Sequence, residues 1–386
     1  MVHGNSKRGR MNARVCVCAG ALCFPQGGGH LWAYLNWALG LRALGCQVIW
    51  LEGVVPGTPT RKVRANIAAL KRSLAPYGFA ESVALYSSSW GGEPLPPGVA
   101  DGCLGLEEAC EADLLLNLAF GIPPEVVRRF PRTALVDIDP GQTQIWISEK
   151  EMDIARHDVY FTIGETVGQP GALFPDCGLQ WEYTPPPVFL PAWAPTRTDA
   201  KAPYTTVTNW WGALMEFQGQ SYYNGKRDGF LPFRDLPLRT TVPLELAIGG
   251  AAEDNDCETL RARGWRVCDA FEVASTPWEY QCYIQDSRGE FSCAKPCCVR
   301  LQNAWVSDRT LCYLASGKPA VVQHTGPSRF LPDSAGLFRF RDFEEAVRCL
   351  EMVEADYEQQ CKLARALAER YFDARKVLTE VLERAL

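Results

Sequence analysis

The sequence predicts an α/β protein made of two doubly wound lobes that face a central cleft, with a C-terminal helix that crosses back to the first lobe. Short apolar runs of strand length alternate with segments of helical spacing through both halves of the chain. A proline-rich stretch, residues 184–204, separates the halves. The length of 386 residues fits about two domains.

The first half alternates strand and helix from its start. Residues 14–21 are an apolar run typical of a buried parallel strand, and residues 31–44 carry apolar side chains at helical spacing up to Gly45. Residues 46–51 form the next strand, so a β–glycine loop–α–β unit opens the chain. Further helices are expected at 61–75 and 123–130, and further strands at 83–86, 112–118, 133–138 and 159–163.

The second half resumes the alternation after the prolines, which cannot continue a central strand or helix. The last segment, 355–386, has a strongly helical pattern with a possible break at Phe372-Asp373. Strands are expected at 204–209, 244–248, 265–268, 291–293 and 319–323, and helices at 256–263, 278–286, 309–316 and 343–350.

These elements divide the chain into four parts. We expect a flexible tail at 1–12, an N-terminal lobe at 13–195, a C-terminal lobe at 196–365 and a terminal helix at 366–386 that packs on the first lobe. The basic residues of the tail and the apolar run behind them resemble a signal peptide, but no convincing cleavage site follows. We therefore expect a cytoplasmic protein.

Composition excludes several classes of protein. Hydrophobic residues make up 47% of the chain, and no apolar run approaches the ~18–20 residues that cross a bilayer. The net charge of -6 argues against a nucleic-acid partner, because phosphate backbones require a basic surface. A local basic pocket for a small anion is compatible with this balance.

Sixteen cysteines do not follow the pattern of a disulfide framework, which belongs to short secreted chains. Several lie in strand-like runs, where a thiol packs as a small hydrophobe. The cluster Cys293, Cys297 and Cys298 lacks paired CxxC spacing and a nearby histidine, so packing is favoured over zinc. No metal is expected.

The first candidate site is the loop that ends in Gly28, Gly29 and His30, just before the first helix. Glycines let a backbone approach a ligand, and free amides at a helix start attract anions. The neutral imidazole of His30 can act as a general base, although it can also cap the helix or pack. The run is not GxGxxG, so no dinucleotide fingerprint is present.

The second candidate site is the pair Asp137 and Asp139, which follows a strand. Carboxyl ends of strands are where open α/β sheets bind ligands. Alternate strand positions face opposite sides, so the two carboxylates need not converge on one ion. A structural turn, a contact to an acceptor or the other lobe, and metal binding all remain open, with metal binding the weakest.

The third candidate site spans three strand–helix junctions between residues 287 and 326. Its cations and hydroxyl donors suit a diphosphate, and a helix start adds amides. The carboxylates of Asp308 and Glu290 can take sugar or ribose hydroxyls, and a salt-bridged surface with an N-cap is the structural alternative. Lys226 is a lower-ranked cation in a glycine-rich loop. The other candidates are Arg288, Lys295, Arg300, Ser307, Arg309 and Thr310.

Residues 309–322, followed by Thr325 and Gly326, resemble the nucleotide-sugar-binding segment of GT-B-fold glycosyltransferases of the family 4 and family 1 type. In that family a helix ends in a turn of a small residue, then Gly, then Lys or Arg, then Pro. A hydrophobic strand follows this turn. The tail 357–386 resembles the fold's terminal helices, and residues 28–30 resemble its acceptor-side entrance. The resemblance implies two Rossmann-like lobes around a cleft.

The resemblance also implies an enzyme that moves a hexosyl group from a nucleoside-diphosphate sugar to a small-molecule or glycan acceptor, without a required metal or other cofactor. Arg309 and Lys295 would neutralise the leaving diphosphate, and His30 would be the base, with Asp308 as a second catalytic candidate. The sugar or phosphate loop would be lined by His324, Thr325 and Gly326.

Two further functions stay open. Retaining members of the family often carry two glutamates separated by seven residues. In this chain the two positions fall near Ala304 and Cys312, and neither is acidic. A nucleotide-sugar 2-epimerase shares the architecture and the diphosphate pocket but needs no acceptor. A non-catalytic sugar-nucleotide-binding protein of the same fold is the other alternative.

Overall fold

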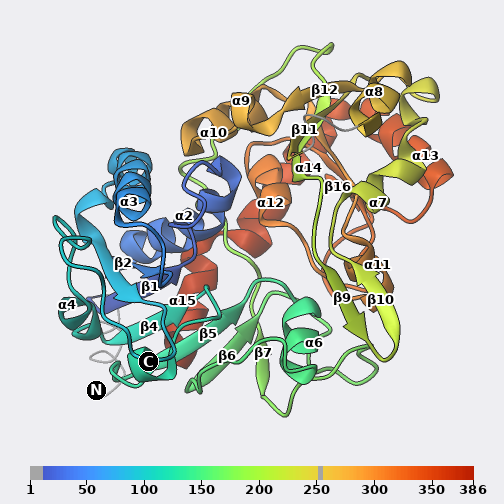
Figure 1. Ribbon diagram of the computed structural model, residues 1–386. Coiled ribbons are helices and arrows are strands. Elements are labelled where there is room, and N and C mark those ends of the chain that lie inside the picture. Colours follow the sequence, from blue (N-terminus) through green and yellow to red (C-terminus); the bar gives the residue numbers. More distant parts are fainter. Residues whose placement is uncertain (1–11, 251–254) are drawn as a thin grey trace, which may run out of the picture.

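The computed structural model describes residues 12–250 and 255–386, and it contains two α/β lobes (Figure 1). Apart from Asn12, the expected tail lies outside the described residues. The first lobe is built on a seven-stranded parallel sheet of order β3-β2-β1-β4-β5-β6-β7. Its strands are β1 (Arg14–Ala19), β2 (Gln47–Val54), β3 (Val83–Ser87), β4 (Leu114–Asn117), β5 (Thr133–Asp137), β6 (Val159–Thr162) and β7 (Trp181–Tyr183).

The central strands of this sheet are mostly apolar because helices cover both faces. In β1 every residue after Arg14 is buried. The helices of this lobe are α2 (Gly28–Ala43), α3 (Thr60–Leu74), α4 (Leu106–Cys110), α5 (Pro124–Val127) and α6 (Gln142–Ser148).

The second lobe carries another seven-stranded sheet, of order β12-β11-β8-β13-β14-β16-β15, in which β15 runs antiparallel to β16. Its strands are β8 (Tyr204–Asn209), β11 (Leu244–Gly249), β12 (Arg266–Asp269), β13 (Gly289–Ser292), β14 (Ala320–Gln323), β15 (Ser334–Ala335) and β16 (Leu337–Phe340). Its helices are α7 (Arg227–Phe230), α8 (Asn255–Ala262), α9 (Ala270–Val273), α10 (Pro277–Asp286), α11 (Pro296–Leu301), α12 (Asp308–Ala315) and α13 (Phe343–Ala355).

A hairpin that the sequence did not predict connects the second lobe to the first. It consists of β9 (Leu214–Phe217) and β10 (Gln220–Tyr223), joined by Gln218 and Gly219, which both have positive φ. Its inner face, Met215, Phe217 and Tyr222, packs in one apolar cluster with Ile145 and Leu135 of the first lobe. Strand β7 and the strands β15 and β16 were also not predicted.

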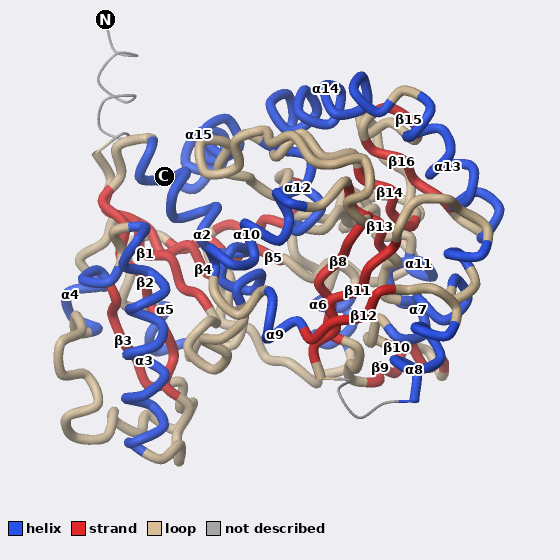
Figure 2. The backbone as a smooth tube through the Cα atoms, turned by 90° about the horizontal axis from the view of Figure 1, so that it is seen from above, coloured by secondary structure: helices blue, strands red, loops and turns tan. Residues whose placement is uncertain are grey.

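The end of the chain returns to the first lobe, as predicted. Helix α14 (Tyr357–Leu367) runs over the second lobe and continues through a π-helical segment, Ala368–Phe372, to α15 (Ala374–Ala385), which lies beside α2 (Figure 2). The expected break at Phe372-Asp373 is present, and the Asp373 carboxylate caps α15 by accepting from the Arg375 amide at 3.1 Å. No helix in the described ranges is long and apolar enough to cross a bilayer.

Candidate functional site

A cavity of about 760 Å³ opens between the two lobes. The first lobe contributes the loop after β1, the start of α2 and the residues that follow β4, β5 and β6. The second lobe contributes the ends of β8 and β11, helix α9 and the start of α12. The carboxyl ends of both parallel sheets therefore face one space, the usual ligand site of open α/β sheets.

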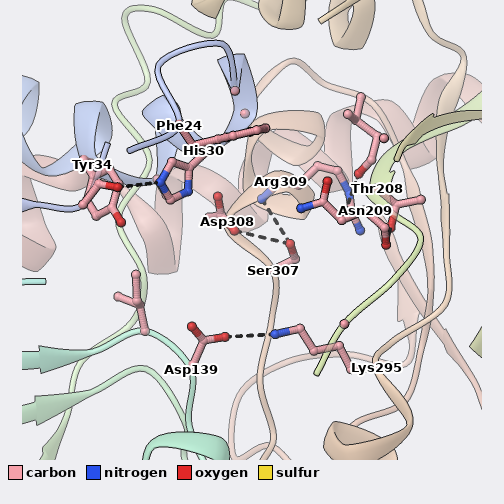
Figure 3. A pocket seen from close by; sticks show the side chains of 18 of the residues that line it. Phe24, His30, Tyr34, Asp139, Thr208, Asn209, Lys295, Ser307, Asp308 and Arg309 are labelled. Atoms are coloured by element: carbon pink, nitrogen blue, oxygen red, sulfur yellow. Dashed lines mark hydrogen bonds and ion pairs between the residues drawn. The ribbon is translucent and has the colours of Figure 1, made fainter. Parts of the chain in front are cut away.

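About half of the predicted site residues line this cavity, and Figure 3 shows their arrangement. Those that line it are Gly28, Gly29, His30, Asp139, Lys295, Ser307, Asp308 and Arg309, together with the lower-ranked Lys226. The predicted residues placed elsewhere are Asp137, Arg288, Glu290, Arg300, Thr310, His324, Thr325 and Gly326.

Arg309 is a rigidly held cation in the wall of the cavity. Its Nε donates to Glu290 Oε1 at 2.8 Å, and its other nitrogens donate to the Val207 carbonyl at 2.9 Å and to Ser292 Oγ at 2.5 Å. Burial by itself would lower the pKa of Arg309, but the Glu290 carboxylate raises it above its ordinary value. Arg309 therefore stays charged although it is buried.

Glu290 has a different role from the one predicted. It is fully buried, and one of its oxygens, Oε2, has no hydrogen-bond partner among the described residues. It is not among the residues that line the cavity, so it is not placed to bind a sugar or ribose hydroxyl there. Its carboxylate instead orients the Arg309 guanidinium.

The start of α12 faces the cavity beside Arg309. Ser307 caps this helix, and its Oγ accepts from the Arg309 amide at 3.3 Å. Asp308 is the first residue of the helix, and burial raises the pKa of its carboxyl group, against the opposing charge of Arg309. The start of the helix thus presents the hydroxyl of Ser307, the carboxyl group of Asp308 and the guanidinium of Arg309 to the cavity.

His30 lies opposite this helix, on the first turn of α2 (Figure 3). Its side chain is exposed, and Nε2 lies 3.1 Å from the Gly20 carbonyl oxygen. A carbonyl accepts only, so this contact places the imidazole hydrogen on Nε2 and leaves the lone pair on Nδ1. The rings of Tyr34 and Phe24 contact the imidazole edge-on at 5.2 and 6.1 Å between centroids.

The glycines before His30 serve a contact between the lobes. They belong to the first turn of α2 rather than to the predicted loop, and the Gly28 amide donates to the Ala274 carbonyl at 3.1 Å. A Cβ at Gly28 would collide with the Thr276 carbonyl, and one at Gly29 would lie 2.6 Å from the Tyr280 ring. Glycine is required at both positions because the second lobe comes close, with its backbone at Gly28 and with the Tyr280 ring at Gly29.

The two predicted aspartates separate in space, as their alternation suggested. Asp137 is fully buried and accepts from Gln144 Nε2 and Thr162 Oγ1, both at 2.8 Å, and burial raises its pKa to about 6. Asp139 faces the cavity, where its Oδ1 lies 3.2 Å from Lys295 Nζ of the opposite lobe. Within residues 12–250 and 255–386, no group of three or more His, Cys, Asp or Glu side chains is arranged to hold a metal.

Arg288 does not line the cavity, which corrects its predicted role. It precedes β13, whereas Lys295 follows it, so the strand carries the two cations to opposite edges of the sheet. Arg288 forms two hydrogen bonds with Glu354, at 2.8 and 2.6 Å, and stacks on Tyr357 at 3.6 Å. Arg300 is likewise used elsewhere, on the hairpin, where it donates to the Ser221 carbonyl at 2.9 Å.

The predicted loop 324–326 supports the cavity wall from behind. Gly326 donates to His324 Nδ1 at 3.1 Å, and its φ of 142° lets it pack against the Gln302 carbonyl, where a Cβ would lie at 2.6 Å. Thr310 and Thr325 line a small recess of about 20 Å³ behind Arg309. These residues do not reach the main cavity.

Lys226 is more central than its low rank from the sequence suggested. It lines the cavity, its Nζ donates to the Cys293 carbonyl at 2.7 Å, and it lies 5.4 Å from the centre of the Trp305 ring. Burial, with a smaller effect of the nearby Arg309 and Lys295 charges, lowers the pKa of Lys226 to about 7.

Two aromatic side chains at the cavity were not predicted at all. Phe24 and Phe271 come from opposite lobes, stay 38% and 43% exposed, and meet edge-on at 5.9 Å. Phe271 lies in the four-residue helix α9, which is too short to give a sequence signal. The predicted cysteine cluster, Cys293, Cys297 and Cys298, is buried in the second lobe.

Comparison with known proteins identifies the fold. No protein-family model and no curated protein matches the sequence. Among solved structures, HepE of Anabaena in complex with UDP-glucose has a TM-score of 0.57 at 12% identity, covering 97% of this chain and 99% of its own. An alpha-glucosyltransferase in complex with UDP and a DNA 13-mer has a TM-score of 0.56 at 10% identity, with 96% and 99% covered.

A glycosyltransferase from Rickettsia africae is also similar, with a TM-score of 0.54, 10% identity and coverage of 97% and 98%. All three similarities extend over both lobes and the terminal helices. At these identities they define the architecture and leave the chemistry to the site itself. The chain therefore has the GT-B fold, the two-lobed α/β architecture of these glycosyltransferases.

Proposed function

We propose that this protein is a glycosyltransferase that moves a hexosyl group from a nucleoside-diphosphate sugar to a hydroxyl or other nucleophile of an acceptor. The observation that carries this proposal is the convergence of Lys226, Lys295, Arg309 and the start of α12 on one wall of the cavity, with His30 on the other. The cavity volume of about 760 Å³ suits a ligand of nucleotide-sugar size.

The two walls divide the chemistry. As the sugar–phosphate bond breaks, the bonding electrons stay with the diphosphate, and its growing charge meets cations that are already in place. Arg309 needs no reorganisation, because Glu290, Ser292 and the Val207 carbonyl hold it. These protein cations supply the charge that a metal ion supplies in other transferases.

The acceptor side lies in the first lobe, which we assign to residues 13–195, and the donor side in residues 196–365. The Nδ1 lone pair of His30 takes the proton of the acceptor hydroxyl while the new glycosidic bond forms. Asp308, across the cavity, is placed to bind a sugar hydroxyl. Among the similar folds, HepE has been solved with UDP-glucose and with UDP and glucose, which supports a donor of this class.

The facing side chains of His30 and Asp308 also suit a second candidate, a nucleotide-sugar epimerase, because acid and base groups would flank the sugar ring (Figure 3). Product analysis separates the two functions. A transferase converts the donor into a glycoside only when an acceptor is present, whereas an epimerase yields an isomeric nucleotide sugar without one.

The proposal is tested by incubating the full chain with UDP-, GDP-, TDP- and ADP-sugars and measuring thermal unfolding. A donor at about 100 times its Kd adds about 2.7 kcal/mol to the free energy of unfolding, so one nucleotide class should raise Tm by several degrees. Arg309→Gln should reduce donor affinity at least tenfold, about 1.4 kcal/mol.

Arg288→Gln is the matched control, because Arg288 is also a buried arginine paired with a glutamate but lies outside the cavity. It should bind the donor as the wild type does. Stabilisation by no nucleotide sugar, or equal losses in the two variants, would refute the proposed donor site.

A further inference from the structure

The donor wall is the side of the cavity formed by Lys226, Lys295, Arg309 and the start of α12. One of its cations, Lys295, is held by a carboxylate of the opposite lobe. Lys295 Nζ lies 3.2 Å from Asp139 Oδ1 and 3.3 Å from Gln142 Oε1, and these residues are more than 150 positions apart in the chain. All three line the cavity, and Figure 3 shows the ion pair spanning it. The pair therefore occupies the space in which we place the diphosphate.

The contact between Lys295 and Asp139 has the properties of an exchangeable pair. It joins one nitrogen to one carboxylate oxygen, and the two side chains remain 25% and 36% exposed. Because both side chains are partly exposed, water reaches the two charges and weakens the pair. The Arg309–Glu290 pair is the opposite case, since its carboxylate is 0% exposed and the guanidinium makes two further hydrogen bonds.

A diphosphate would compete well for Lys295. It carries more negative charge than one carboxylate and offers several oxygens to the same ammonium group. Lys226 and Arg309 add positive charge on the same wall, and the Lys226 and Lys295 charges oppose each other. A polyanion relieves this repulsion, whereas Asp139 neutralises one cation only.

We propose that Asp139 occupies Lys295 as an internal anion, that the donor diphosphate displaces it, and that this exchange releases the Asp139 carboxylate to the acceptor. The inference rests on the proposed function and adds to it a positioning step without covalent chemistry. The freed carboxylate accepts a hydrogen bond from an acceptor hydroxyl beside His30. The acceptor site is thus complete only after the donor has bound.

The test is a double-mutant cycle on the full chain with two defined probes, UDP and inorganic pyrophosphate, measured by titration calorimetry. Asp139→Asn removes the competing charge but keeps the side-chain shape, so Kd for both probes should fall about threefold to tenfold. Lys295→Gln should raise Kd about tenfold. In the Lys295→Gln background, adding Asp139→Asn should change Kd less than about twofold, because the exchange partner is gone.

Glu165→Gln provides the matched control. Glu165 of the first lobe pairs with Arg329 of the second at 3.2 Å, and neither residue lines the cavity. This variant also weakens a contact between the lobes, so an unchanged Kd separates the exchange from simple loosening. Far-UV circular dichroism and Tm confirm that each variant is folded.

Three results would overturn the exchange. If Asp139→Asn lowered Kd equally in the wild type and in Lys295→Gln, the effect would be a general change in electrostatic field. If it left Kd unchanged, Asp139 would not compete with the probe. If Glu165→Gln also lowered Kd, the cause would be loosening of the lobes. In each of these cases the wild type still binds the probes, and the proposed function stands. Absence of binding by the wild type would instead refute the donor site and the exchange together.

Discussion

Two buried arginines of the second lobe show that the partners of a side chain and its place along a strand decide its role. Arg309 and Arg288 are each paired with a glutamate, at 2.8 and 2.6 Å. Arg309 lies at the carboxyl edge of the sheet and lines the cavity, whereas Arg288 lies at the amino edge and supports α13 through Glu354. The chemistry of the residue is the same, so only the position makes one of them a candidate for donor binding.

His30 is expected to act in turnover and not in donor binding. Replacing it with Ala removes the Nδ1 lone pair from the acceptor wall, so kcat should fall about 100-fold to 10,000-fold, while the donor Kd stays unchanged. His30→Gln can still donate to the Gly20 carbonyl but supplies no base, and it should be equally slow. Near-normal turnover in either variant, with the donor saturating, would remove His30 as the base.

Lys226 should make donor binding depend on pH. Its pKa is about 7 in the free protein, and a bound diphosphate raises it. Below pH 7 Lys226 is therefore protonated both in the free protein and in the complex, and the affinity for UDP is greatest there. As pH rises above 7, the free protein loses a proton that the complex keeps. UDP affinity should therefore decrease, and at pH 8 binding should take up about one proton.

Calorimetry in buffers of different ionisation enthalpy measures this proton uptake. Lys226→Arg is the control, because arginine stays charged through the whole range and should take up no proton. If the variant took up as many protons as the wild type, the linked group would be another residue.

At the level of elements, helix α2 contacts the second lobe, the first sheet and the terminal helix α15. Its first turn contacts the second lobe through Gly28, its middle covers the first sheet, and its C-terminal half packs against α15. Eleven of its sixteen residues are buried, which explains why its apolar residues extend around the helix instead of forming one stripe.

Gly40 allows the close approach of α2 and α15. A Cβ at this position would lie 2.5 Å from Leu378 Cδ1 and 2.7 Å from Ala374 Cβ. Gly40→Val should therefore overpack this contact and lower the free energy of unfolding by about 1–3 kcal/mol. Denaturant unfolding measures the change, with Gly121→Val as the control, since no atom lies within 4 Å of a Cβ at Gly121.

At the level of the whole molecule, the cavity exists because the two lobes are held at one distance. Hydrogen bonds between them join the Gly28 amide to the Ala274 carbonyl and Trp32 Nε1 to the Pro277 carbonyl, at 3.1 and 2.8 Å. Ion pairs add Lys295 to Asp139 and Arg329 to Glu165. The terminal helix α15 connects the lobes a second time.

Gly28→Ala tests this arrangement. The added methyl group would lie 2.6 Å from the Ala274 carbonyl oxygen, so α2 and the second lobe must separate at this point. Because the donor wall lies within one lobe, the variant should still bind the donor, whereas kcat should fall at least tenfold as His30 moves away. Gly91→Ala, whose Cβ would make only an ordinary contact with Ser89 Oγ at 3.6 Å, should leave donor binding and kcat unchanged. An unchanged kcat in Gly28→Ala would contradict the proposed role of this contact.

Much of the fold could be predicted because its signals are local. Strand β8 lies at the predicted residues, and α12 and β14 deviate by one residue, since apolar runs, N-caps and glycine stops act over a few neighbouring positions. The hairpin β9–β10 was missed because its apolar inner face packs against side chains of the other lobe, which are distant in the sequence. Strand β16 was missed because Arg339 interrupts its apolar run.

For the candidate site, the residue types and their location at strand ends follow from the sequence alone, because carboxyl ends of parallel strands share one edge. Which of them meet was decided by tertiary structure. Arg309 finds Glu290 19 positions away, Lys295 finds Asp139 156 positions away, and Gly28 meets a backbone some 250 positions along the chain. The local sequence gives the chemical type of each side chain. The distances between these side chains, their burial and their partners are determined only when the two lobes pack against each other.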